Sequence, residues 1–220
     1  MNHYKTLMLV MFFLFVFCLG KINASIRNYG LFGRCIYVDA GHGGRDSGAL
    51  SNTFMEKDMN LILSNKLALE LFSRGAMVFL TRDGDYDLSH STVNKKRDDL
   101  YRRVKLINSS NCDMYISIHM NASPSSRWQG IQVFYSNIMS ENRIIAEVIT
   151  DSLRNNISNV RKFKKENGYY MYSKLKVPGV LIEAGFISNS NDNYKIRQEK
   201  YQDVFVKNIV NGVEKYFNNK

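Results

Sequence analysis

Residues 35–44 read Cys-Ile-Tyr-Val-Asp-Ala-Gly-His-Gly-Gly, and the rest of the chain is organised around them. The apolar run at 35–38 is typical of a buried strand, and it stops abruptly at a glycine-rich turn. Glycine adopts backbone conformations that other residues resist, so the chain can bend tightly around His42. In open α/β sheets, the loops at the carboxyl ends of strands carry the chemistry. His42 therefore stands where a ligand or catalyst belongs, although a lone histidine in a turn is more often an ordinary loop residue.

Further apolar runs at 77–80, 114–118, 131–135 and 180–184 predict more buried strands. Apolar residues at helical spacing predict helices over 59–74, 95–108 and 141–153, and a C-terminal helix that includes Val204 to Phe217. In the third of these we expect four buried residues: Ile144, Ile145, Val148 and Ile149. Alternating strands and helices predict an α/β fold, a single domain with a mixed, mostly parallel sheet of about six strands and helices on both faces.

The composition suits one soluble domain with a basic surface. The chain has 220 residues, of which 45% are hydrophobic and 23% charged, enough for a sizeable core. Its formal charge is +10, which suggests a polyanionic neighbour such as nucleic acid, an anionic membrane or an anionic wall polymer. A solvated basic surface without a specific partner is the alternative.

The N-terminus carries an export signal. Residues 7–19 are uninterrupted apolar and follow Lys5. A membrane span needs about 20 apolar residues, so this shorter run matches the core of a secretory signal. Ala24 is a candidate cleavage residue, but the bulky Ile22 makes the site imperfect. We expect residues 1–24 to be a signal peptide or an N-terminal membrane anchor, with membrane contact only through this segment. An exported chain rarely meets nucleic acid, which argues against that partner.

Two cysteines lie outside the signal segment. Cys35 and Cys112 each begin or precede an apolar run and lie seven residues before a histidine. If the two strands are neighbours, the thiols stand at similar height. Export permits a disulfide, but we favour two small buried hydrophobic side chains and leave the pairing open.

Four polar residues form the candidate chemistry. His42, Glu56 and His119 offer two imidazoles and a carboxylate, a zinc ligand set that leaves a fourth position open. Glu183 interrupts an apolar strand, where a carboxylate is costly unless it is paired or functional. The alternatives are a capping or surface role for Glu56 and an ion pair with a buried arginine for Glu183. The long spacing makes the pattern weak by itself.

The motifs resemble a known family. Residues 38–49, Val-Asp-Ala-Gly-His-Gly-Gly-Arg-Asp-Ser-Gly-Ala, resemble the opening motif of the zinc-dependent N-acetylmuramoyl-L-alanine amidases. Blocks at 56–61, 80–83, 103–108, 116–122 and 180–189 resemble later motifs of the family in the same order. The resemblance covers residues 34–217, which we expect to be the catalytic domain. Its departures, Ala40 and Met120, remove no polar group.

The resemblance implies an activity and residue roles. These enzymes cut peptidoglycan between the lactyl group of muramic acid and the first stem alanine, on a phosphorylase/hydrolase-like sheet. Zn²⁺ would be the cofactor, with His42, Glu56 and His119 as ligands and Glu183 as the catalytic residue that takes a proton from water and passes it to the leaving amine. Arg103 and Asn121 are candidate substrate contacts, although we prefer a structural role for Arg103.

The short layout is similar to that of one subgroup. Germination-specific amidases of spore-forming bacteria act on cortex peptidoglycan in preparing muramic δ-lactam. We therefore expect a cortex substrate and a location in the cell wall or at the outer face of the membrane, with the forespore intermembrane space as a candidate. A protein partner that localises the enzyme or supports zinc binding is a further hypothesis. The alternatives are a zinc peptidase or carboxypeptidase on the same fold and a catalytically silent wall-binding protein.

Overall fold

The computed structural model describes residues 30–219. The predicted signal peptide or anchor, residues 1–24, lies outside the described residues. Within 30–219, no helix is both long enough and apolar enough to cross a bilayer.

The described chain folds around one sheet. Its strands are β1 (Cys35–Ala40), β2 (Met77–Leu80), β3 (Met114–Asn121), β4 (Gln132–Tyr135), β5 (Lys164–Lys165) and β6 (Gly179–Phe186). They are ordered β2-β1-β3-β6-β4-β5, and only the β4–β6 pair is antiparallel. The predicted mixed, mostly parallel sheet is therefore confirmed. The sequence did not predict β5 as a strand, because it is a two-residue edge strand in a basic, exposed segment.

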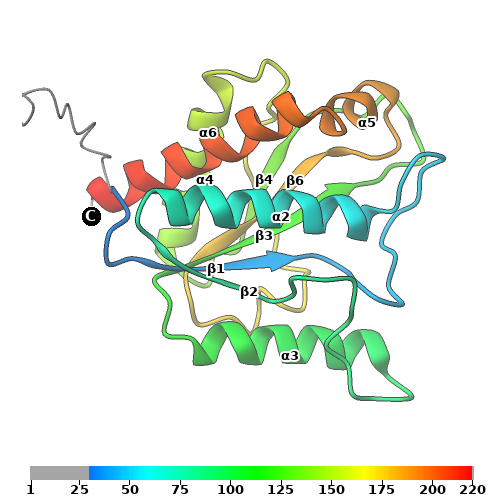
Figure 1. Ribbon diagram of the computed structural model, residues 1–220, viewed down its shortest axis with the longest axis horizontal. Coiled ribbons are helices and arrows are strands. Elements are labelled where there is room, and N and C mark those ends of the chain that lie inside the picture. Colours follow the sequence, from blue (N-terminus) through cyan, green and yellow to red (C-terminus); the bar gives the residue numbers. More distant parts are fainter. Residues whose placement is uncertain (1–29, 220) are drawn as a thin grey trace, which may run out of the picture.

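Helices cover both faces, as predicted. They are α2 (Glu56–Ser73), α3 (Lys95–Ser109), α4 (Ser140–Arg154), α5 (Ser190–Ile196) and α6 (Glu199–Asn218). Figure 1 shows α3 on one side of the sheet, with α2, α4 and α6 on the other. Helix α2 ends at Ser73, and Gly75 follows two residues later with a left-handed φ of 94°. The unpredicted α5 is short, and the side chain of Asn189 caps it by accepting bonds from the amides of Asn191 and Asp192.

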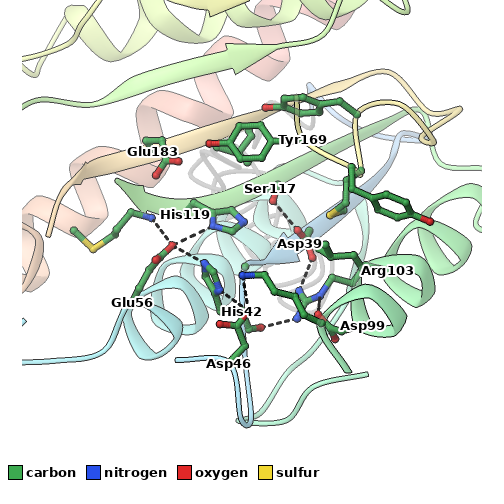
Figure 2. A pocket seen from close by; sticks show the side chains of 18 of the residues that line it. Asp39, His42, Asp46, Glu56, Asp99, Arg103, Ser117, His119, Tyr169 and Glu183 are labelled. Carbon is green, nitrogen blue, oxygen red and sulfur yellow. Dashed lines mark hydrogen bonds and ion pairs between the residues drawn. The ribbon is translucent and has the colours of Figure 1, made fainter. Parts of the chain in front are cut away.

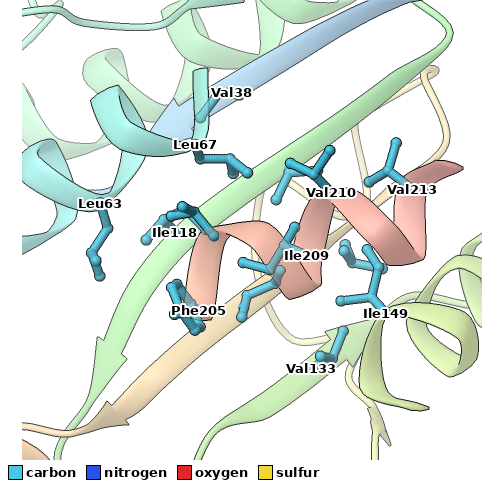
Figure 3. Packing of buried hydrophobic residues seen from close by; sticks show 14 of the residues in the cluster. Val38, Leu63, Leu67, Ile118, Val133, Ile149, Phe205, Ile209, Val210 and Val213 are labelled. Atoms are coloured by element: carbon cyan, nitrogen blue, oxygen red, sulfur yellow. The ribbon is translucent and has the colours of Figure 1, made fainter. Parts of the chain in front are cut away.

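Side-chain alternation along the strands separates the core from the site. Successive residues of a strand point to opposite faces of the sheet. Ile36, Val38, Ile116, Ile118 and Ile182 pack with α2, α4 and α6 in the main core, part of which is drawn in Figure 3. The intervening residues Asp39, Ser117, His119 and Glu183 line a cavity on the opposite face. The expected burial in α4 is wrong at one position, since Ile144 is 52% exposed while Ile145 and Ile149 are buried.

The structure pairs Cys35 with Cys112, which corrects the favoured expectation of two unpaired side chains. The pairing follows from the sheet, because β1 and β3 are adjacent and parallel. The two Cα atoms lie 4.6 Å apart, within the range that a disulfide spans. Tyr37, Val104 and Ile107 pack in the same apolar cluster between the sheet and α3.

Removing this disulfide should destabilise the domain. The bond joins positions separated by 77 residues, so its loss frees a long loop in the unfolded chain. We expect the double variant Cys35→Ser/Cys112→Ser to lose about 2–4 kcal/mol of unfolding free energy. Urea denaturation checks this, and a reductant should bring the wild type close to the variant. Equal stability of the variant and the oxidised wild type would contradict the pairing.

Candidate active site

A tight turn after β1 presents His42. Its φ of 61° is left-handed, which is uncommon for a residue with a side chain, and Gly43 and Gly44 follow with positive φ. The backbone of the turn is closed by reciprocal bonds between Gly43 and Asp46, both 3.0 Å. The carbonyl of His42 accepts a bond from Arg103. These contacts hold the turn that the glycines predicted and direct the imidazole into the cavity.

The structure brings the three predicted ligands together (Figure 2). Glu56 Oε1 lies 3.1 Å from His42 Nε2 and 3.1 Å from His119 Nδ1. One donor atom from each of the three residues lies within 4.8 Å of the other two, and together they form a possible metal site. His42 lies in the turn after β1, Glu56 is the first residue of α2, and His119 lies in β3. Residues that are far apart in the sequence therefore meet at one end of the sheet.

Glu56 is a buried, oriented carboxylate rather than a surface residue. Its Oε2 accepts the amide of Ala49 at 2.8 Å, and its Oε1 accepts Asn60 Nδ2 at 3.2 Å. The pairing of β3 with β6 shifts register just after His119, and the amide of Met120 donates to Oε1 at 3.1 Å. Burial alone would raise the pKa of Glu56, but the contacts with His119 and His42 outweigh it and lower the pKa. The group is therefore ionised, as a metal ligand requires.

Asp46 lies against the other ring nitrogen of His42. Its Oδ2 is 2.9 Å from Nδ1, an ion-pair distance, although the ring N–H is not aligned for a standard hydrogen bond. Burial would lower the pKa of His42, but Glu56 and Asp46 outweigh burial and raise it. A carboxylate at one ring nitrogen favours the tautomer that leaves the other free to bind a metal. The donor set fits zinc, whose usual ligands are imidazole nitrogen and carboxylate oxygen.

Two glycines keep the space around the ligands open. A Cβ at Gly41 would overlap the imidazole of His119. Gly48 has a φ of 65°, and a Cβ there would lie 2.6 Å from Glu56 Oε2. The glycines of the motif therefore serve the side-chain packing of the site as well as the backbone turn.

Glu183 faces the same cavity from β6. In the strand register it lies opposite His119, and it is only 5% exposed. Burial, with the charge of Glu56, raises its pKa well above the ordinary value. Its Oε2 has no hydrogen-bond partner in the part of the chain that the structure describes, and no ion pair with an arginine is found there. The ion-pair alternative for this residue is therefore not what the structure shows.

The cavity has a volume of about 310 Å³. His42, Glu56, His119 and Glu183 line its polar side, and a wall with several aromatic side chains comes from residues 169–172. Asn121 also lines it, so its predicted role as a substrate contact has the required location and stays a prediction.

Arg103 is buried beneath the site. It is 1% exposed, and it contacts Asp39 Oδ1 at 2.8 Å and Asp99 Oδ2 at 2.7 Å. It also donates to the carbonyls of Ala40 and His42. These contacts occupy most of the donors of its guanidinium and match the structural role that we preferred for Arg103.

Asp39 and Asp46 have no role predicted from the sequence. Asp39 is an acidic residue in a buried apolar strand, the same signal that singled out Glu183. Asp46 stands four residues after His42 in the opening motif, but only the folded turn shows that it reaches the ring. Arg82, in the block at 80–83, is also buried, and it donates to the carbonyls of Gly41 and Lys57.

A family model described as N-acetylmuramoyl-L-alanine amidase matches residues 36–215. The chain belongs to the N-acetylmuramoyl-L-alanine amidase family. It is therefore a hydrolase that cleaves the amide bond between N-acetylmuramic acid and L-alanine in peptidoglycan, which confirms the predicted family and activity.

Relatives and solved structures agree with this assignment. A germination-specific N-acetylmuramoyl-L-alanine amidase of Bacillus subtilis is 39% identical over 219 residues, covering 96% of this chain and 92% of the relative. The amidase LytC of the same organism is 32% identical over 90% of this chain and 38% of its own length. The CwlD amidase from Clostridioides difficile, solved in complex with the GerS lipoprotein, is 34% identical with a TM-score of 0.81, covering 86% of this chain and all of that chain.

The Asp39–Arg103 pair should make stability depend on pH. Burial would raise the pKa of Asp39, but Arg103 and Ser117 outweigh it and lower the pKa from 3.8 to about 2. The stabilisation is therefore complete above pH 3.8 and is lost as the pH falls towards 2. We expect Asp39→Asn to cost roughly 2–3 kcal/mol at neutral pH, because it removes one of the two carboxylates that pair with the buried Arg103 and leaves only Asp99.

The loss of unfolding free energy in Asp39→Asn should become smaller in acid, because the carboxyl of Asp39 in the wild type is then protonated as well. Urea unfolding at neutral pH and near the pKa of Asp39 checks it. The exposed acid Asp151, replaced as Asp151→Asn, is the control and should change little at either pH. A deficit that is the same at both pH values would contradict the assigned pairing.

Proposed function

We propose that this amidase is zinc-dependent, with His42, Glu56 and His119 as the metal ligands and Glu183 as the catalytic carboxylate. The observation that carries the proposal is the position of Glu183. A buried carboxyl oxygen without a protein partner faces the same cavity as a three-residue ligand set. Glu183 is not part of that set, so the two functions fall on different residues.

A zinc ion held by the three ligands would supply Lewis-acid polarisation of the carbonyl and would acidify water at its open position. Glu183 takes a proton from the water that attacks the amide carbon. It then gives the proton to the nitrogen of L-alanine as the C–N bond breaks, and the water oxygen stays on the lactyl carboxyl. Burial raises the pKa of Glu183 above its ordinary value, which is the direction that favours a carboxyl group as proton donor to the leaving amine.

Neighbouring residues hold the ligands in place. Asp46 orients the ring of His42, and the amides of Ala49 and Met120 with the side chain of Asn60 fix the carboxylate of Glu56. Such outer contacts raise metal affinity by setting ligand direction before binding.

Three variants separate metal binding from catalysis. Glu183→Gln should keep the zinc content of the wild type measured in parallel and lose roughly 100- to 10,000-fold in cleavage rate, the range for a general acid–base. His42→Ala should lose both zinc and activity, and His90→Ala, an exposed histidine outside the cluster, should lose neither. Metal analysis and digestion of purified sacculi give the two readouts.

Wild-type activity in Glu183→Gln would remove that residue from the mechanism, and full zinc in His42→Ala would remove His42 from the ligands. Mass spectrometry of the digest identifies the bond that is cut. Intact stem peptides with a free L-alanine amine support the amidase, whereas shortened stems on muramic acid would indicate a peptidase or carboxypeptidase.

We also propose that the substrate is spore cortex peptidoglycan. The similarity to the germination-specific amidase of Bacillus subtilis, over nearly the whole of both chains, supports this. Muramic δ-lactam closes through the lactyl carboxyl, so the stem peptide must first be removed from it. Residues 1–24 would export the domain to the cell wall or to the outer face of the membrane, with the forespore intermembrane space as the site of action.

Cortex composition tests this assignment. Spores of a host strain that carries only Glu183→Gln should lack muramic δ-lactam and keep full stem peptides, while spores with the wild-type gene contain the lactam. Chromatography and mass spectrometry of digested cortex measure both. Normal lactam content in the variant spores would contradict the cortex role.

A protein partner that localises the enzyme or supports zinc binding is the last part of the proposal. The related CwlD amidase was solved in complex with a lipoprotein, which supports it. Purified protein with full zinc occupancy and full activity on its own would contradict a need for a partner.

A further inference from the structure

One wall of the catalytic cavity is an irregular segment, residues 166–176, that is fixed to its surroundings. The amide of Glu166 donates to the carbonyl of Tyr135 at 2.8 Å, which ties the start of the segment to β4. The amide of Lys176 donates to Asn108 Oδ1 at 2.8 Å, which ties its end to α3. Between them, Leu175 is buried against α3 and the sheet. The side chains of this wall therefore have defined positions.

Tyr169 stands on this wall with its ring held from one side. Its ring meets that of Tyr172 edge to face, with 5.4 Å between centroids. Tyr172 is 3% exposed and its hydroxyl lies 3.5 Å from the carbonyl of Phe134, so the supporting ring is itself anchored. Tyr169 remains 44% exposed and lines the cavity. Its open side is the side that a substrate would occupy.

The hydroxyl of Tyr169 has no hydrogen bond to another residue of the described range 30–219. Figure 2 shows the side chain with its hydroxyl end towards Glu183. Glu183 Oε2 also lacks a partner, so the two groups face a shared space without bonding each other. Burial, then the charges of Glu183, Glu166 and Glu56, raises the pKa of Tyr169. The hydroxyl therefore keeps its proton at neutral pH and can donate.

We propose that Tyr169 contacts the substrate, its hydroxyl donating a hydrogen bond to the carbonyl oxygen of the scissile amide. The inference rests on the proposed function, because the reacting amide must lie between Glu183 and the three ligands. Attack of water on the amide carbon moves negative charge onto that oxygen. A donor already aimed at this space stabilises the transition state more than the bound substrate. The proton stays on Tyr169 throughout.

Tyr169→Phe tests the hydroxyl alone, since it keeps the ring and its contact with Tyr172. We expect kcat on purified muropeptides to fall roughly 10- to 100-fold, the effect of one hydrogen bond to developing charge, with KM changed less than about twofold. Zinc content and melting temperature should match the wild type. Tyr194→Phe is the matched control, an exposed tyrosine on α5 outside the cavity lining, and it should leave kcat and KM unchanged.

Each other outcome overturns the inference. Wild-type kinetics in Tyr169→Phe would show that the hydroxyl makes no contact in the reaction. A fall in rate with a matching loss of zinc or melting temperature would show a structural role, and a fall with a shifted pH–rate profile would show action through Glu183. If the wild type itself does not release stem peptides, the proposed function fails and the inference with it. An active wild type with an equally active variant rejects the inference alone.

Discussion

The buried ion pair between Asp39 and Arg103 is the contact on which the site depends. Asp39 lies one residue before the end of β1, and it also accepts hydrogen bonds from Ser117 on β3 at 2.6 Å and from Thr81 after β2 at 2.8 Å. Arg103 reaches across from α3 and binds the carbonyl of His42. One pair therefore fixes three strands, a helix and the turn of the first proposed ligand. Two buried charges are tolerable here because hydrogen bonds satisfy most of their polar atoms.

One face of the sheet packs in the hydrophobic core, and the other face carries the polar residues of the site. The face under α2, α4 and α6 is apolar throughout, and its burial stabilises the fold. The opposite face carries Asp39, His119 and Glu183, which are costly to bury. The same three strands supply both sets through alternation, so the apolar core directly supports the polar groups. This arrangement explains how the chain keeps a carboxyl such as Glu183 without a protein partner, a state that a ligand or substrate would relieve.

The sequence predicted those features of the fold that depend on local residue patterns. Strand ends, the glycine turn and the burial of Glu183 followed from alternation and from an acidic residue in an apolar run. The convergence of His42, Glu56 and His119 was implied by the family motif and is borne out in the fold. Contacts set by tertiary packing were not predictable in this way. The Asp39–Arg103 pair joins residues that are 64 positions apart in the sequence. The disulfide depends on which strands are neighbours in the sheet. Ile144 has helical spacing, yet its side chain is on the exposed side of α4. Tyr169 lies in an irregular segment, so neither helical nor strand periodicity predicts the direction of its side chain.

The central claim is that His42, Glu56 and His119 bind one zinc ion together. Anomalous X-ray diffraction from crystals of the zinc-loaded protein, collected on both sides of the zinc absorption edge, tests it most directly. We predict a single strong peak within about 2.0–2.2 Å of His42 Nε2, His119 Nδ1 and a carboxylate oxygen of Glu56. No peak in the cavity, or a peak that any of the three residues fails to reach, would contradict the account.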